Sequence, residues 1–148
     1  MKSILSFDYY DVLETVYKHN PIFEESNGEE MSITPSFNLN IKYKDKKRTE
    51  ATLLFTTELG DEGLQKYPFY IKACILGVFS LEIKDQEDEN TIINNMYKKN
   101  AVAILYPYMR SLVSDLSSKG NEMPLILPPI NVGAMIENEE LITEEYPE

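Results

Sequence analysis

The segment ITPSFNLNIKY, residues 33–43, indicates the fold class most clearly. Its apolar residues fall at positions 33, 37, 39, 41 and 43, and successive side chains of a β-strand point to opposite faces of a sheet. The segment therefore predicts a strand with one apolar and one polar face. Pro35 lacks an amide proton, so it should lie at the start of this strand or at the edge of the sheet.

Three further strands are predicted around it. Residues 51–57 alternate in the same way and follow a charged turn at residues 44–48. Residues 4–16 alternate only in places, which still favours a strand. Residues 67–82 are apolar on both faces, so this strand is either central or covered by two layers.

After the fourth strand the apolar spacing changes to three and four, which predicts a long helix over residues 100–119. Asn100 can cap its start, and Gly120 suits the left-handed stop at its end. Pro107 lies inside the helix and predicts a kink. A shorter helix is expected before it, near residues 91–98.

These elements predict one α+β domain over residues 1–136, with a four-stranded antiparallel meander sheet, a long C-terminal kinked helix and short flanking helices. Residues 137–148 carry six acids and no base. They are expected to form a solvated, frayed acidic C-terminal tail.

The overall charge narrows the choice of partners. The chain has 14 Lys and Arg against 25 Asp and Glu, a net charge of −11, so nucleic acid is not an expected partner. The sequence shows neither a secretion signal nor an apolar run of the roughly 20 residues that span a bilayer. We therefore expect an acidic cytoplasmic protein with no direct membrane insertion.

The residues that could carry chemistry are few. His19 is the only histidine and cannot anchor a histidine-based metal site alone, and Cys74 lies within a predicted strand, where cysteine usually acts as a small apolar residue. The acidic stretch 85–90 lacks the glycine of a calcium loop. The sequence therefore predicts no catalytic residue, no metal and no cofactor, and so no enzyme.

The apolar residues on both faces of strand 67–82 are the unusual feature. Helices can cover one face of a single sheet, and a bare apolar face usually marks an interface. Two interpretations stay open at this point: an oligomer buries the surface, or a groove binds extended apolar segments of other chains.

Four blocks, spread over about 100 residues, resemble one protein family. They are NAVAILYPYMRSLVSDLSSKG at residues 100–120, LILPPIN at 125–131, GVFSL at 77–81 and PSFNLNI at 35–41. In this order they resemble the SecB-type export chaperones.

The resemblance implies an ATP-independent holdase that binds unfolded or late-folding polypeptides in hydrophobic grooves, and a homotetramer built as a dimer of dimers. The client-binding residues that it implies are Phe37, Leu39, Ile41, Tyr43, Tyr106, Ile130, Met135 and Ile136. The implied oligomer interface contains Ile71, Ala73 and Ile75.

SecB proteins hand clients to the motor SecA partly through acidic residues on the exposed sheet. On this chain the resemblance places the motor-contact surface at Glu14, Lys18, Tyr70 and Lys72, so only Glu14 is an acid. Reversed charges change partner choice more than folding. We therefore expect weak or absent SecA binding, and a non-export client such as an antitoxin is an alternative. A small-ligand-binding or enzymatic α+β domain, and an oligomer whose apolar faces are consumed in self-association, are the alternatives of other classes.

Overall fold

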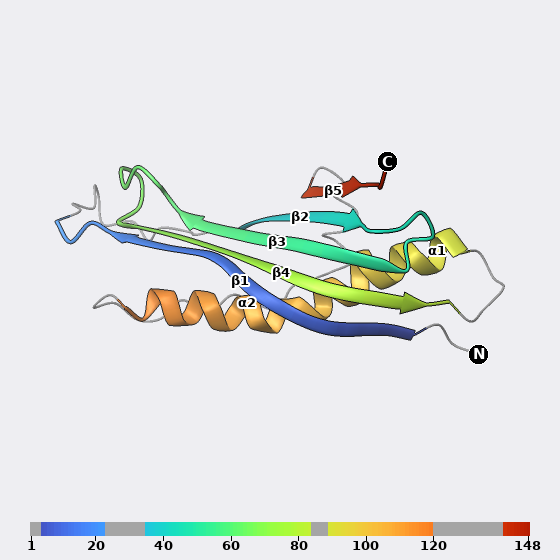
Figure 1. Cartoon of the computed structure of the whole chain (residues 1–148). Helices are drawn as coiled ribbons and strands as arrows, with labels where there is room; N and C mark the ends of the chain where they lie inside the picture. The colour runs from blue at the N-terminus through green and yellow to red at the C-terminus, as the bar shows by residue number, and fades with distance from the viewer. Residues whose placement is uncertain (1–3, 23–34, 84–88, 120–140) are drawn as a thin grey trace.

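Four long antiparallel strands carry a layer of helices along one face, as Figure 1 shows. The computed structural model describes residues 4–22, 35–83, 89–119 and 141–148. The strands are β1 (Ile4–His19), β2 (Ser36–Tyr43), β3 (Glu50–Gly60), β4 (Phe69–Glu82) and the short β5 (Ile142–Glu145). The helical layer consists of α1 (Glu89–Asn94), a π-helical turn η1 (Asn95–Asn100) and α2 (Ala101–Ser117).

The strand order is β1-β4-β3-β2-β5. Strands β2, β3 and β4 therefore form a meander, and β1 lies beside β4 instead of beside β2. The strand with two apolar faces was predicted to be either central or covered by two layers. Because β4 pairs with β1 on one side and β3 on the other, the first of these alternatives is confirmed. The α+β class with an antiparallel sheet and a long C-terminal helix is confirmed too, but the sheet has five strands instead of four.

The core lies between the sheet and the helices. Every second residue of the central strands points toward the helical layer, where apolar side chains of α2 meet them at intervals of three and four. Burying one such side chain stabilises a fold by roughly 1.5–3 kcal/mol, so this cluster holds the helices on the sheet. Its largest fully buried members include Leu39, Ile41, Tyr43, Leu53, Phe55, Ile71, Ile75, Phe79, Tyr97, Leu105 and Met109.

Two glycines are required by close approaches of other groups. At Gly77 of β4, a Cβ atom would lie 2.8 Å from Leu105 Cδ2 and from Phe79 Cε2, so the missing side chain leaves the space that Leu105 of α2 fills. Gly60, at the end of β3, has a φ of +85°, and a Cβ there would lie 2.2 Å from the carbonyl oxygen of Phe69. Any larger residue at Gly60 would meet a backbone atom that cannot move aside.

The helical layer begins earlier than the capping pattern predicted. Asn100 has helical backbone angles and makes no side-chain capping hydrogen bond, because the chain is already helical before it. The prediction of a cap at Asn100 is therefore wrong. Pro107 lies inside α2 as expected, and both it and Ala103, whose carbonyl loses its amide partner, are exposed. Water can reach that carbonyl, and the kink at Pro107 stays a prediction.

The acidic tail is partly a strand, which corrects the expectation that residues 137–148 are frayed. Ile142–Glu145 pairs in parallel with β2, with Ile142 opposite Leu39 and Glu145 opposite Lys42. This pairing covers main-chain groups of β2 that an edge strand would otherwise present to solvent. The predicted domain boundary at residue 136 lies outside the described residues.

Candidate functional surfaces

The described part of the predicted client-binding set gathers under the helical layer. Leu39, Ile41 and Tyr43 are buried on the helix-facing side of β2. The rings of Phe37 and Tyr106 lie there as neighbours, with centroids 6.0 Å apart. The rest of the predicted set lies outside the described residues: Ile130, Met135 and Ile136.

The predicted oligomer-interface residues lie on the same side of the sheet. Ile71, Ala73 and Ile75 of β4 are fully buried, and they belong to the same cluster as the client-binding set. Packing within one chain is enough to explain why all these positions are apolar, so both roles stay predictions. Alternation shows which side chains share a face, but not which layer covers that face.

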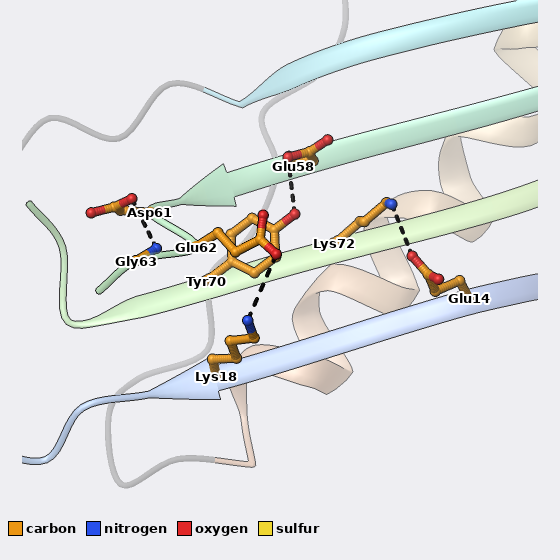
Figure 2. A network of polar contacts seen from close by, with 8 residues as sticks. All are labelled: Glu14, Lys18, Glu58, Asp61, Glu62, Gly63, Tyr70 and Lys72. Carbon is orange, nitrogen blue, oxygen red and sulfur yellow. Dashed lines mark hydrogen bonds and ion pairs between the residues drawn. The ribbon is translucent and has the colours of Figure 1, made fainter. Parts of the chain in front are cut away.

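The predicted motor-contact residues meet on the open face of the sheet, away from the helices (Figure 2). Glu14 and Lys18 come from β1, whereas Tyr70 and Lys72 come from β4. Strand pairing sets Lys18 opposite Tyr70 and Glu14 opposite Cys74. Lys72 Nζ lies 2.9 Å from Glu14 Oε1, so the acid that the resemblance assigns to motor contact is paired within the chain.

Two further acids belong to this cluster, and the sequence analysis missed them. Glu58 of β3 accepts a hydrogen bond of 2.9 Å from the hydroxyl of Tyr70. Glu62 Oε1 lies 3.7 Å from Lys18 Nζ, which in turn lies 5.8 Å from the centroid of the Tyr70 ring. Glu58 is opposite Lys72 in the pairing of β3 with β4. That Glu58 and Lys72 are neighbours becomes visible only when the strand register is known.

The hydrogen bonds of the cluster fix its charges. Burial and the hydrogen bond to Glu58 raise the pKa of Tyr70 to about 12. The hydrogen bond and the charge of Glu14 raise the pKa of Lys72. Backbone amides of the following loop lower the pKa of Asp61, which Figure 2 shows beside the cluster. At neutral pH the face is therefore a mosaic of paired charges and not a uniformly acidic patch.

An open depression of about 390 Å³ lies next to these charges. Glu14, Glu58 and Lys72 are among its polar lining groups, and Leu13 and Leu54 are among its apolar ones. Ligand sites for small molecules are usually enclosed, so this opening suits a side chain of a partner protein better. Among the residues that the structure describes, no three His, Cys, Asp or Glu side chains gather as metal ligands would.

Strand β1 exposes apolar side chains along its length. It has a strand neighbour on one side only within the described residues. Asp8 and Leu13 are skipped in its pairing with β4, and such bulges change the direction in which the following side chains point. The exposed large apolar residues of this strand, called the β1 edge below, are Ile4, Tyr9, Tyr10, Val12 and Leu13.

Aromatic rings join the β1 edge to the helical layer. The ring centroids of Tyr10 and Tyr108 of α2 lie 4.4 Å apart, and those of Phe7 of β1 and Tyr108 lie 5.9 Å apart. Tyr108 is itself exposed. The sequence predicted the uncovered apolar surface on strand 67–82. Within the described residues, however, five of the eight exposed large apolar side chains lie on β1, whose broken alternation was the available signal.

A family description matches most of the chain. The SecB family, described as preprotein translocase subunit SecB, matches residues 12–141. This chain belongs to the SecB family. An uncharacterized protein of Methanocaldococcus jannaschii is 30% identical over 148 residues, which cover 99% of this chain and 92% of the relative. The protein-export protein SecB of Nitrosococcus oceani is 28% identical over 134 residues, which cover 83% of this chain and 77% of the relative.

A solved structure supports the same fold. It is that of a SecB-like chaperone of Mycobacterium tuberculosis in complex with a ChAD peptide from an antitoxin; the TM-score is 0.62, the identity is 15%, and the match covers 85% of this chain and 90% of the other. The SecB resemblance is thus confirmed, and so is the expectation that the chain is not an enzyme. No helix in the described ranges is long and apolar enough to cross a membrane.

Proposed function

We propose that this SecB-family protein is an ATP-independent chaperone that holds unfolded or late-folding polypeptides on apolar surface. Its family and fold support a chaperone role in protein export or in client binding. The observation that carries the proposal is the β1 edge, where Tyr9 and Leu13 are 56% and 54% exposed. Several large apolar side chains are exposed on this one strand, and exposed apolar surface usually marks an interaction site when it forms a large patch.

The same edge supports self-association, and we propose a homotetramer, a dimer of dimers, that works in the cytoplasm. Within the described residues, one chain leaves the β1 edge and Tyr108 without cover, and a second copy is the simplest way to bury part of them. The surface that remains after assembly is then offered to clients. The solution mass, measured by light scattering on the purified protein, tests the tetramer directly.

Suppression of aggregation tests the holdase. A reduced, unfolded client is diluted with the protein at a stoichiometric ratio, and turbidity is followed. The wild type should delay aggregation, and the double variant Tyr9→Ser/Leu13→Ser should delay it less because apolar contact area is lost. Ile22→Ser is the matched control, since Ile22 is 83% exposed but lies outside β1. No delay by the wild type at any ratio would end the proposal.

A non-export client, such as an unstable antitoxin, is the second candidate, and the open face of the sheet favours it. Glu14 is paired with Lys72, and Lys18 adds a second positive charge to the same face. A partner whose binding surface recognises acidic residues is repelled by positive charge on this face, and the repulsion slows association. We therefore expect this protein to bind a SecA-type motor weakly or not at all.

Charge reversal tests the partner choice. Binding of a SecA-type motor is measured at low and high salt with the wild type and with Lys18→Glu/Lys72→Glu. The variant should bind tighter, by about tenfold or more, and the gain should shrink at high salt. A tight, salt-sensitive complex with the wild type would show that these lysines do not set partner choice.

A peptide titration separates the holdase from the other classes. An extended apolar peptide should bind the assembled protein, whereas an oligomer whose apolar faces are all buried in self-association has no surface left for it. A small-ligand domain would instead bind a compact ligand in an enclosed pocket. The peptide result therefore separates the holdase from both other classes.

A further inference from the structure

Strand β5 differs from every other strand of the sheet. It has four residues, it pairs in parallel, and its only strand neighbour within the described residues is β2. Parallel pairing is slightly less stable per residue than antiparallel pairing, so main-chain hydrogen bonds over four residues hold such a strand only weakly. Addition of a short extended segment to an exposed sheet edge is also how many proteins bind peptides.

Side chains add specific contacts to this weak pairing. Ile142 and Glu144 lie opposite Leu39 and Ile41, so both point to the core side of the sheet. Thr143 lies on the open side, where its hydroxyl accepts a hydrogen bond of 2.9 Å from Asn40 Nδ2. A carboxylate on the core side of a sheet is unusual, because burial without partners disfavours a charge.

Glu144 has the partners that its position demands. Lys98 Nζ of η1 lies 2.8 Å from Glu144 Oε1, and both side chains are 21% exposed. The hydroxyl of Tyr43, the last residue of β2, donates a hydrogen bond of 2.6 Å to Glu144 Oε2, and Tyr146 donates one of 3.2 Å to the same atom. Burial alone would raise the pKa of Glu144, but the hydrogen bonds from Lys98 and Tyr43 outweigh it and lower the pKa.

Tyr43, which receives Glu144, is positioned by contacts that do not involve β5. The ring of Tyr43 meets the ring of Tyr97 edge to face, with centroids 5.7 Å apart, and the guanidinium of Arg48 lies 5.7 Å from the Tyr43 centroid. Tyr97 in turn donates a hydrogen bond of 2.7 Å to the carbonyl oxygen of Arg48. Tyr43 is therefore held in place without the strand, and Lys98 of η1 adds a positive charge from the helical layer.

We propose that the edge of β2, with Asn40, Tyr43 and Lys98, is a binding site for an extended peptide that carries an aliphatic residue two positions before an acid. The chain's own Ile142–Glu145 is its resident and exchangeable occupant. A segment of another polypeptide with this pattern binds in parallel to β2 when the resident strand leaves. Only the source of that segment, a client, rests on the proposed chaperone function; the site itself does not.

The test uses a labelled peptide with the sequence of residues 141–148, LITEEYPE, and the full-length chain. In the full-length variant Glu144→Lys, Lys98 repels the resident strand, so the added peptide should bind this variant about tenfold or more tighter than it binds the wild type. Glu148→Lys in the chain is the matched control. Glu148 is exposed and lies outside β5, so this change should leave peptide affinity close to that of the wild type.

A charge swap identifies the receptor. A peptide with Lys in place of the acid that corresponds to Glu144 should bind the Glu144→Lys chain at least about tenfold more weakly than the natural peptide does. The single variant Lys98→Glu keeps Glu144, so it also repels its resident strand, and in this chain the preference between the two peptides should reverse. Equal binding of the natural peptide to the wild type and the variant, no binding to either, or an unchanged preference after the swap would each overturn the site.

Two further measurements keep the outcomes separate. Circular dichroism should show that Glu144→Lys stays folded. If it unfolds, the milder variant Glu144→Gln takes its place, and the gain in peptide affinity should be smaller. The aggregation assay on the same samples reports on the chaperone role. Peptide binding without any holdase activity would support the site and contradict the proposed function. Holdase activity without peptide binding would support the proposed function and contradict the site.

Discussion

The two edges of the sheet are completed in opposite ways. On one side, β2 is covered by β5, a strand of the same chain fixed by Glu144 between Tyr43 and Lys98. On the other side, β1 exposes large apolar side chains and has no further strand beside it within the described residues. Exposed edges invite pairing with other chains, and proteins usually protect them. One edge is protected by its own chain, and the other offers surface to other molecules.

The largest expected effect comes from changing the β1 edge. Replacing Tyr9 and Leu13 together with lysine should reduce the assembly to a smaller species, because each large apolar side chain contributes roughly 1.5–3 kcal/mol when it is buried. Light scattering coupled to size exclusion measures the mass. Ile22→Lys is the matched control and should leave the mass unchanged. An unchanged mass for the double variant would show that assembly does not use this edge.

A substitution between the two edges provides a reference for global stability. Gly60→Ala places a Cβ 2.2 Å from a backbone carbonyl oxygen at a φ of +85°, and should lower the free energy of unfolding by about 1–3 kcal/mol. Gly63→Ala is the control, because the nearest atom to its Cβ would be a side-chain oxygen of Asp61 at 3.7 Å. Chemical denaturation measures both. Similar losses for the two variants would contradict the role assigned to Gly60.

The protected edge should open on its own when Glu144 is changed. Glu144→Gln removes the charge that pairs with Lys98, so the amides of Ile142–Glu145 should exchange with solvent about tenfold faster, a change of roughly 1.4 kcal/mol in local opening. The amides of β4 should be unaffected. Hydrogen exchange followed by mass spectrometry measures both segments. Equal acceleration in β4 would mean that β5 does not open independently.

Acid should open the same edge in the wild type. The pKa of Glu144 is lowered from its ordinary value of 4.5, so its contribution to docking is present above pH 4.5 and is lost as the pH falls through the lowered value. Relative to the intrinsic exchange rate at each pH, the protection of the amides of β5 should therefore fall in acid, and the protection in Glu144→Gln should fall less.

The smallest expected effect concerns the open face between the edges. The pKa of Tyr70 is raised to about 12. The stabilisation of the fold that goes with this shift is fully present below pH 10 and is lost as the pH rises through 12. Carbon NMR of labelled tyrosine should show Tyr70 protonated at pH 11. Glu58→Gln should lower this pKa, while Glu145→Gln, far away on β5, should not. A value for Tyr70 near 10 in the wild type would contradict the hydrogen bond to Glu58.

The sequence predicted the regular parts of the fold well, for a clear physical reason. The alternation in β2 and β3 and the spacing of three and four in α2 each reflect one buried face, which is a local property of the chain. The central position of β4 was one of the two alternatives that its two apolar faces left open. The neighbour of β1 was not predictable in this way, because pairing with β4 joins segments that are far apart in the sequence.

The misses have physical causes as well. Strand β5 has four residues in an acidic run, and its Glu144 points to the core side, which reverses the usual pattern. The apolar face that includes Leu39 and Ile71 was predicted correctly as a face. Whether a helix, a client or another subunit covers it depends on the layer above, which alternation does not encode. The charge cluster around Lys72 was found in part, because Glu58 becomes its neighbour only through register.

The absence of a side chain at Gly77 has a mechanical consequence. Leu105 of α2 occupies the space that the missing side chain of Gly77 leaves in β4, so the helix and the sheet interlock at this point. A helix held in this way resists displacement along its own axis, because Leu105 would have to climb onto the neighbouring bulky residues of β4. Any motion that gives a guest chain access to the covered face must therefore begin by lifting α2 off the sheet and not by sliding it.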